Sequence, residues 1–430
     1  MGGFRPRVLG VAAVACVMLL APPRSAAQES VAFYSSVSIP TPADFVSAFV
    51  TGIAVAGPQV RVAWVGQRSS GPLDWGYDAS VNGGLSFNSV VGFFSYTYDA
   101  VRARVAALST GAFAYVWSDR ARGEVRLEIE EGDSFRAPPD PLVSFSTDFD
   151  IGADDTGAYI AWTEGYWGNS SVQIGALDLT TLQFARTRTV SAVSSGLVSN
   201  VRLSVLDGVL ALAWLRLLNN TSTVMFSSMG QDLQSSSPVS VSGNASSDEG
   251  IPTLALGPGG LAFVGFGRVY TPGPIRAWTA PRNDTFQPIP GFASSIGAQI
   301  VDGLAATFDA QGRLLLSWVD SLAGNLTQDS VTRFTRTVSG VSGFLPTSRL
   351  DADLTIKTAA AVAADADGRA FVAWTELQPM EVHVAREVSA PPTVGVGPVW
   401  VPFVILGVDL TAVAGVLIFL RRSRPPDTSA

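Results

Sequence analysis

Residues 358–387, TAAAVAADADGRAFVAWTELQPMEVHVARE, show most plainly the unit from which the chain is built. A run of small residues at 358–365 is followed by a turn and by an apolar run at 369–375, which contains Trp374. After a polar loop, residues 381–387 (EVHVARE) form a third strand-like segment. Short apolar runs bounded by turn residues are typical of β-strands. We interpret the unit as three antiparallel strands, and the small residues favour the innermost position for the first.

The aromatic residue of this unit recurs about every 52 residues. Each copy lies in a short apolar run, and the spacings between consecutive copies are 53, 45, 52, 52, 52 and 56 residues. A period of about 40–55 residues with several strands per repeat is typical of β-propellers. Seven repeats therefore predict an all-β, seven-bladed β-propeller. The repeat aromatics are Trp64, Trp117, Trp162, Trp214, Phe266, Trp318 and Trp374.

The seventh repeat has no fourth strand of its own, because the sequence continues into Pro391 and Pro392. Residues 31–39, VAFYSSVSI, resemble the fourth strands of other repeats. We expect them to pair beside residues 381–387 and close the ring, since closure removes the exposed strand edges. The length of residues 28–390 matches seven repeats, which makes this segment the predicted propeller domain.

The first 27 residues have the pattern of a signal peptide. Arg5 and Arg7 precede an apolar stretch at 8–21, and residues 25–27 are small, as a cleavage site requires. We expect residues 1–27 to be removed on export.

Residues 394–420 are apolar over a length sufficient to cross about 30 Å of hydrocarbon. Arg421 and Arg422 follow at once, so the positive-inside rule predicts a short cytoplasmic tail at 421–430. The chain is thus expected to be a single-pass protein of the cell membrane with an extracellular N-terminal domain. Asp409 lies within the predicted helix, either as a contact to another helix or as a protonated acid.

The composition excludes several classes of function. The formal net charge is −8, and no basic cluster lies outside the ends of the chain, so we do not expect nucleic-acid binding. Cys16 is the only cysteine and lies in the predicted signal peptide, so the mature chain should contain no disulfide. His383 is the only histidine, which excludes a zinc site or a Ser–His–Asp triad within one chain. We expect no metal ion and no cofactor.

Six glycosylation sequons fall in the predicted propeller. They lie in turn-like segments, as in an exposed glycoprotein, provided that the host modifies such sites. The acceptors are Asn169, Asn219, Asn220, Asn244, Asn283 and Asn325.

Residues 80–87, SVNGGLSF, resemble the Asp-box of sialidase-type propellers, S-x-D-x-G-x-T-W, with Asn82 for Asp and Phe87 for Trp. Residues 131–135 resemble an eroded copy. The resemblance implies a propeller of the bacterial neuraminidase repeat superfamily, in which the box is a structural turn remote from the catalytic face.

In that family three arginines grip a carboxylate, an aspartate is the acid/base, and a tyrosine assisted by a glutamate is the nucleophile. An F/Y-R-I-P element supplies the first arginine. Residues 135–138, FRAP, are similar, but they follow the second repeat and are expected in an outer strand. No spacing singles out three arginines, so a sialidase-like glycoside hydrolase is an alternative and not our leading prediction.

Propellers usually bind ligands on the face that carries the connections between second and third strands. The position two residues past each repeat aromatic opens this face. A polar ring there would bind a sugar, cation or peptide, or form only a solvated rim; hydrolysis by paired carboxylates such as Asp119 and Glu164 is a further alternative. The ring consists of Gly66, Asp119, Glu164, Arg216, Arg268, Asp320 and Glu376.

Four aromatic residues lie in what we predict to be loops of this face. Trp75 and Tyr77 follow in the first repeat, and Tyr166 and Trp167 in the third. Exposed aromatics beside polar groups suit sugar rings or a protein partner. We therefore predict a membrane-anchored cell-surface propeller that acts as a recognition or adhesion module for glycan or protein ligands. A non-enzymatic role is favoured, and a structural protein of the cell envelope is a third alternative.

Overall fold

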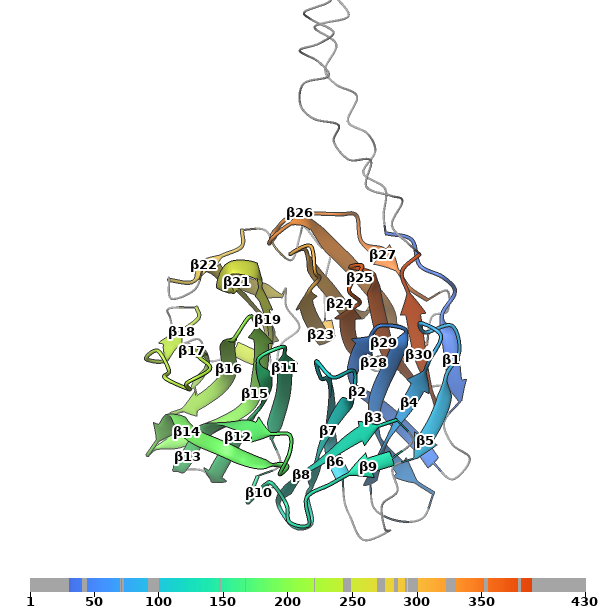
Figure 1. Cartoon of the computed structure of the whole chain (residues 1–430). Coiled ribbons are helices and arrows are strands. Elements are labelled where there is room, and N and C mark those ends of the chain that lie inside the picture. The colour runs from blue at the N-terminus through green and yellow to red at the C-terminus, as the bar shows by residue number, and fades with distance from the viewer. Residues whose placement is uncertain are drawn as a thin grey trace, which may run out of the picture. The chain divides into compact units, whose positions relative to one another are not determined.

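The strands of the computed structural model form seven antiparallel sheets, which confirms the predicted seven-bladed β-propeller (Figure 1). They belong to one compact unit, Met1–Glu387. The structure describes residues 31–388 except for 41–44, 70, 72, 92–99, 133, 147, 167, 220, 243–248, 269–274, 282–284, 291, 293–300, 322–329, 352–354 and 378–379.

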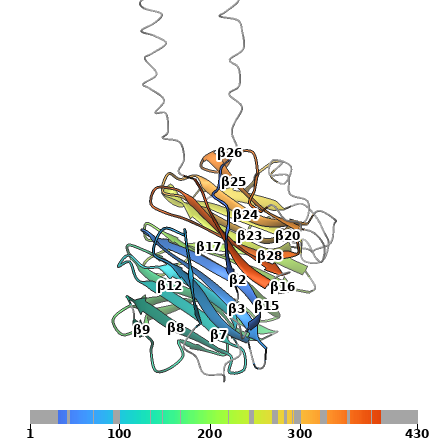
Figure 2. The ribbon, with the colours of Figure 1, turned by 90° about the vertical axis from the view of Figure 1, so that its right-hand side faces the viewer.

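The first strand of each blade is innermost. It occupies one end of the strand order in its sheet, and the first strands of successive blades contact one another around a closed ring. After a quarter turn of the molecule, β2, β15, β23 and β28 lie near the centre of the view (Figure 2). The first strands are β2 (Phe45–Ala56), β6 (Ala100–Ala107), β11 (Phe149–Asp154), β15 (Gly196–Leu206), β19 (Glu249–Gly257), β23 (Val301–Phe308) and β28 (Lys357–Ala364).

The second strands carry the repeat aromatics, which pack between blades. Each large apolar cluster joins two neighbouring blades. Burial of this apolar surface contributes about 25 cal/mol per Å² to folding. The second strands are β3 (Gln59–Arg68), β7 (Phe113–Asp119), β12 (Gly157–Tyr166), β16 (Val209–Leu218), β20 (Leu261–Arg268), β24 (Leu314–Ser321) and β29 (Ala370–Leu377).

The third strands pair antiparallel to the second strands, and the outer strands pair in turn with the third. In blades 2 and 6 two short pieces replace a continuous outer strand. The third strands are β4 (Leu73–Ser80), β8 (Glu124–Glu131), β13 (Asn169–Asp178), β17 (Thr221–Gly230), β21 (Arg276–Ala280), β25 (Ser330–Ser339) and β30 (Met380–Arg386). The outer strands are β5 (Asn88–Val91), β9 (Ser134–Arg136) with β10 (Val143–Ser144), β14 (Gln183–Val193), β18 (Val239–Ser240), β22 (Gln287–Pro288), β26 (Ser342–Phe344) with β27 (Ser348–Arg349), and β1 (Val37–Pro40).

The N-terminal strand closes the ring, as predicted. In Figure 1, β1 (blue) lies beside β30 (orange-red), and Val37 pairs with Val384 while Ile39 pairs with Val382. Ile39 is buried in the apolar cluster between blades 7 and 1. The last blade is therefore built from both ends of the propeller sequence.

The predicted signal peptide (1–27) and membrane span (394–420) lie outside the described residues. Within the described part of the chain, no helix has the length and apolar character needed to cross a membrane.

Candidate functional site

A β-bulge recurs in the first strands near one end of the propeller. This is the end at which the connections between second and third strands lie, and we call it the 2–3 face. Bulges redirect side chains and are common beside binding sites. In the described residues, register shifts mark such bulges in six blades, at Val50/Gly52, Ala100/Arg102, Ser199/Arg202, Glu249/Pro252, Asp302/Ala305 and Thr358/Ala360.

One position in each first strand pairs with the residue that precedes the repeat aromatic, so these positions are equivalent in all seven blades. We call them the axial ring. Charge is confined to three consecutive blades, where the ring holds Arg, Asp and Arg. The ring consists of Gly52, Arg104, Asp150, Arg202, Thr253, Ala305 and Ala361.

Two further charges extend this group towards the 2–3 face. Arg102 forms an ion pair with Asp148, and Arg104 Nε lies 3.3 Å from Asp150 Oδ1. We call Arg102, Arg104, Asp148, Asp150 and Arg202 the axial charge cluster. All five side chains come from the inner edges of blades 2, 3 and 4.

The backbone of neighbouring blades holds the cluster in place. The amide N–H of Val201 donates to Asp148 Oδ2 at 3.1 Å, and that of Leu203 donates to Asp150 Oδ2 at 3.0 Å. The Arg104 guanidinium also donates to the carbonyl oxygen of Thr51. The arrangement thus links four blades and fixes the positions of the charged groups.

The cluster has an excess of positive charge. Three guanidinium groups face two carboxylates, and Arg202 forms no ion pair within the described residues; its Nη1 donates to the carbonyl oxygen of Val201 at 2.9 Å. Burial, followed by repulsion from the other arginines, lowers the pKa of Arg104 to about 9 and that of Arg202 to about 10. Both groups still carry their charge at neutral pH, so an added anion would be stabilised there.

Most acids of the predicted polar ring are not open to ligands. Asp119 and Asp320 are buried, and they pair with Arg122 at 2.6 Å and with Arg333 at 2.8 Å. Glu376 is buried too, 3.3 Å from His383 Nε2. The expectation of an open acidic rim is therefore wrong at these three positions, because a basic side chain covers each carboxylate.

The other ring positions differ from one another. Glu164 is exposed, whereas Asp119 is buried. Arg216 is half-buried, and its Nε has no hydrogen-bond partner in the described residues. The side chain of Arg268 lies outside the described part. A Cβ on Gly66 would lie 2.3 Å from the carbonyl oxygen of Ser47, so packing accounts for this glycine.

Two of the predicted loop aromatics are core residues. β4 begins at Leu73, so Trp75 and Tyr77 lie in a strand and are buried. The Trp75 ring stacks 6.1 Å from that of Trp117. The prediction of a long aromatic loop is wrong here. Tyr166 is exposed as expected, and Trp167 lies outside the described residues.

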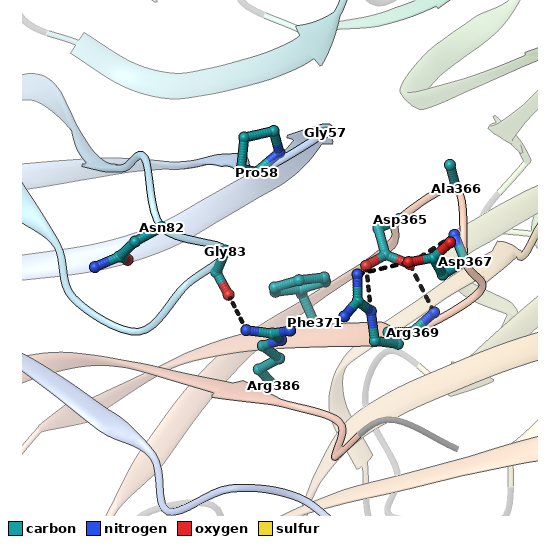
Figure 3. Close-up of a pocket in the computed structure, with 10 residues that line it drawn as sticks. All are labelled: Gly57, Pro58, Asn82, Gly83, Asp365, Ala366, Asp367, Arg369, Phe371 and Arg386. Atoms are coloured by element: carbon teal, nitrogen blue, oxygen red, sulfur yellow. Dashed lines mark hydrogen bonds and ion pairs between the residues drawn. The ribbon is translucent and has the colours of Figure 1, made fainter. Parts of the chain in front are cut away.

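A cavity of about 330 Å³ lies on the opposite face, at the seam between blades 7 and 1 (Figure 3). Its charges are mostly paired internally: Arg369 bonds Asp365 at 2.6 Å and Asp367 at 2.8 Å, and Arg386 Nη1 donates to the carbonyl oxygen of Gly83 at 3.0 Å. The Arg386 contact ties the turn of blade 1 to β30 of blade 7, and we assign the cavity to the closure of the ring.

The turn that resembles an Asp-box borders this seam. The Asn82 side-chain oxygen accepts hydrogen bonds from the amides of Leu85 and Ser86, both at 3.1 Å. Ser80 Oγ accepts from the amide of Gly84 at 2.9 Å. The segment therefore acts as a hydrogen-bonded turn, far along the strands from the axial charge cluster.

A buried tyrosine–glutamate pair lies between blades 1 and 2. The Tyr115 hydroxyl donates to Glu130 Oε2 at 2.6 Å, and Arg61 Nη2 bonds Glu130 Oε1 at 2.7 Å. Burial and the charge of Glu130 raise the pKa of Tyr115 well above its usual range. The pair is buried, and Glu130 lines a cavity of about 340 Å³ on the opposite face, away from the 2–3 face.

The remaining predictions concern metal and glycan attachment. In the described part of the chain, no group of three or more His, Cys, Asp or Glu residues is placed to hold a metal ion. Asn169 and Asn219 are exposed. The other four sequons, at Asn220, Asn244, Asn283 and Asn325, lie outside the described residues.

No protein-family model and no curated protein matches the chain. Among solved structures, the polysaccharide lyase Uly1 superposes with a TM-score of 0.56 at 7% identity, over 84% of this chain and 100% of that one. A protein of unknown function from Dyadobacter fermentans gives 0.49 at 11%, over 84% and 99%. Trypanosoma rangeli sialidase gives 0.47 at 8%, over 82% of this chain and 58% of that one. At such identities the likeness concerns the fold alone, which is that of a β-propeller.

Proposed function

We propose that this protein is a cell-surface recognition propeller that binds an acidic glycan through the axial charge cluster. The observation that carries the proposal is the imbalance of three guanidinium groups and two carboxylates on three adjacent inner strands. A carboxylate on the ligand completes the pairing, and arginine binds carboxylates with two parallel hydrogen bonds.

A glycan fits this cluster better than a polyanion. Only one positive charge is unmatched, and the net charge of −8 repels a densely charged partner such as a nucleic acid. An acidic sugar carries one carboxylate on an otherwise neutral, hydroxylated ring. The predicted signal peptide and membrane span would display the site outside the cell.

Recognition is favoured over sialidase-like hydrolysis. A hydrolase of that kind requires a tyrosine nucleophile and a glutamate beside the arginines. In the part of the chain that the structure describes, the tyrosine that bonds a glutamate is Tyr115; its partner is Glu130, both are buried between blades, and the raised pKa of Tyr115 opposes nucleophilic attack. A glycoside hydrolase and a purely structural envelope protein are therefore the alternatives that the experiment must separate.

Isothermal titration of the full-length protein in detergent tests the proposal. The ligands are glucuronate and N-acetylneuraminate, each alone and at the end of a disaccharide, with neutral sugars for comparison. We expect binding of an acidic sugar, weakened at least about 10-fold in Arg202→Ala, since a charged hydrogen-bonded contact is worth about 1.5–3 kcal/mol. Arg186→Ala, an exposed change on β14, is the matched control.

Equal binding of neutral and acidic sugars would refute the proposal. Release of free sugar from the acidic disaccharides, lost in Arg202→Ala, would favour the hydrolase. An absence of binding and turnover would leave the structural role.

A further inference from the structure

Phe145 is a strained and exposed residue three positions before Asp148 of the axial charge cluster. It lies on the 2–3 face, between β10 of blade 2 and β11 of blade 3, with φ at +64° and 81% of its surface exposed. A left-handed backbone is costly for a bulky residue, and an exposed phenyl ring forgoes the free energy of burial. The fold thus gains neither a relaxed backbone nor a buried ring at this position.

Hydrogen bonds hold this segment in its conformation. The Ser146 amide donates to the carbonyl oxygen of Gly123 at 2.8 Å, and Ser146 Oγ donates to that of Asp148 at 3.2 Å. On the other side, Val143 pairs with Val125. The Phe145 ring is therefore presented by an ordered backbone, which lowers the entropic cost of binding a ligand.

Tyr166 supplies a second exposed ring on the same face. It ends β12 in the hairpin of blade 3, opposite Asn169, and is 72% exposed. The amide of Thr163 donates to the carbonyl oxygen of Asp148 at 3.0 Å, which sets β12 directly beside the cluster. Phe145 precedes Asp148 by three residues and Tyr166 follows Thr163 by three, so each ring starts within roughly 11 Å of this hydrogen bond.

We propose that Phe145 and Tyr166 form an aromatic platform for the sugar ring next to the acidic sugar in the axial charge cluster. This inference rests on the proposed function. The C–H face of a pyranose packs on aromatic rings while its hydroxyl groups stay in water. The arginines fix the carboxylate and the platform binds the neighbouring unit, so the site prefers an acidic disaccharide to the acidic sugar alone.

Phe145→Gly tests the platform, because glycine removes the ring and accepts a positive φ. The titrations use the full-length protein with the acidic sugar that binds, alone and in its disaccharide. We expect the disaccharide to bind about 5- to 10-fold more weakly, as the loss of an aromatic contact predicts. Affinity for the single sugar and the Tm should not fall. Phe145→Tyr should keep wild-type affinity, and Leu85→Ala, an exposed change on the opposite face, is the control.

Three results would overturn the inference, and they are distinguishable. Unchanged disaccharide affinity in Phe145→Gly, with binding still lost in Arg202→Ala, rejects the platform and retains the proposed function. An equal loss for both ligands shows that Phe145 does not act on the second sugar. Failure of the wild type to bind any acidic sugar rejects both proposals.

Discussion

The inner edges of blades 2–4 and of blades 5–7 share one backbone geometry but differ in chemistry. At equivalent positions of the axial ring, blades 2–4 carry Arg104, Asp150 and Arg202, whereas blades 5–7 carry Thr253, Ala305 and Ala361. Small side chains let neighbouring strands approach without desolvating charge. Charged side chains at these positions lose hydration, and only well-placed ion pairs and hydrogen bonds offset this free-energy cost. The sevenfold fold therefore supplies an equivalent axial-ring position in every blade. Only blades 2–4 carry charged residues at these positions, and these residues form the candidate site.

In both arcs, side chains of the first strands bond to the backbone of a neighbouring blade. In the charged arc of blades 2–4, Asp150 accepts from the amide of Leu203. In blades 5–7, Lys357 Nζ donates to the carbonyl oxygen of Ser330 at 3.3 Å, and this arc ends at the seam where β1 pairs with β30. Mutations at the seam should therefore change the free energy of unfolding by altering apolar burial. Mutations in the axial charge cluster of blades 2–4 should change it by altering the balance of charge.

The largest effect is expected at the seam, from Ile39→Asp. Ile39 lies in the cluster between blades 7 and 1, and a carboxylate there has no basic partner among the residues of that cluster. We expect the free energy of unfolding to fall by about 4 kcal/mol, from lost burial and charge desolvation. Urea denaturation measures the change. Ser35→Asp, on the exposed stretch before β1, should have almost no effect, and equal stability of the two variants would contradict a closing role for β1.

The next effect is expected in the charged arc, from Asp150→Asn. The change keeps the size of the side chain but removes the charge that balances Arg104, leaving three largely buried guanidinium groups with one carboxylate, that of Asp148. Removal of one partner of a buried pair costs about 3–5 kcal/mol, and the partial exposure of this pair places our expectation near the lower end. Thr253→Ala, at the equivalent position of blade 5, should cost less than about 1.5 kcal/mol. Similar losses in both variants would show that the two arcs do not differ as described.

A buried carboxylate outside the cluster gives an effect that depends on pH. Glu128 accepts a hydrogen bond from Trp117 Nε1 at 3.1 Å, and its Oε2 has no partner in the described residues. Burial raises the pKa of Glu128 to about 7. The unfolded chain loses this proton at lower pH than the folded protein does, so stability falls as pH rises from about 4.5 to 7 and then levels off.

Glu128→Gln should remove this dependence. At pH 8 we expect it to raise the free energy of unfolding by about 2 kcal/mol, since each unit of pKa shift corresponds to about 1.4 kcal/mol and the glutamine amide is costly to bury as well. At pH 4 the two proteins should be nearly equal. Urea titrations across this range provide the test, with the exposed Glu131→Gln as control. A constant difference at every pH would contradict the assignment.

The fold was predictable because its signal is local and periodic. Each blade must bury one aromatic residue in its second strand, and Trp214 or Trp318 marks this position whatever the other blades contain. The closing strand followed from the missing fourth strand of the last repeat. Both predictions rest on composition and spacing, which the sequence displays directly.

The site was only partly predictable, because pairing across strands is not local. The sequence places Asp119 and Asp320 at strand ends. It does not show that they form ion pairs with Arg122 and Arg333, which occupy their carboxylates. The prediction that Trp75 lies in a loop is wrong because the turn after β3 is short. Although the sequence there is polar, β4 already begins at Leu73. Sequence reasoning missed the axial charge cluster, although its signal was present: charged residues interrupt first strands made of small and apolar residues, at the repeat spacing. Phe145 had no signal, since backbone strain is not visible in sequence.

The smallest effect separates stability from function in the charged arc. Arg202 has no ion pair in the described residues and is repelled by Arg102 and Arg104, so its removal relieves charge that the folded protein does not balance. We expect Arg202→Ala to leave the free energy of unfolding unchanged or to raise it by up to about 1 kcal/mol, as is common where a site is kept at the expense of stability. Arg104→Ala should instead destabilise the protein, because it removes the ion-pair partner of Asp150 and the side-chain donor to the carbonyl oxygen of Thr51. Urea denaturation of the two variants without ligand decides the point. A large loss of stability in Arg202→Ala would mean that this arginine holds the blades together, and the excess charge at the axis would then be a structural feature with no need of a ligand to explain it.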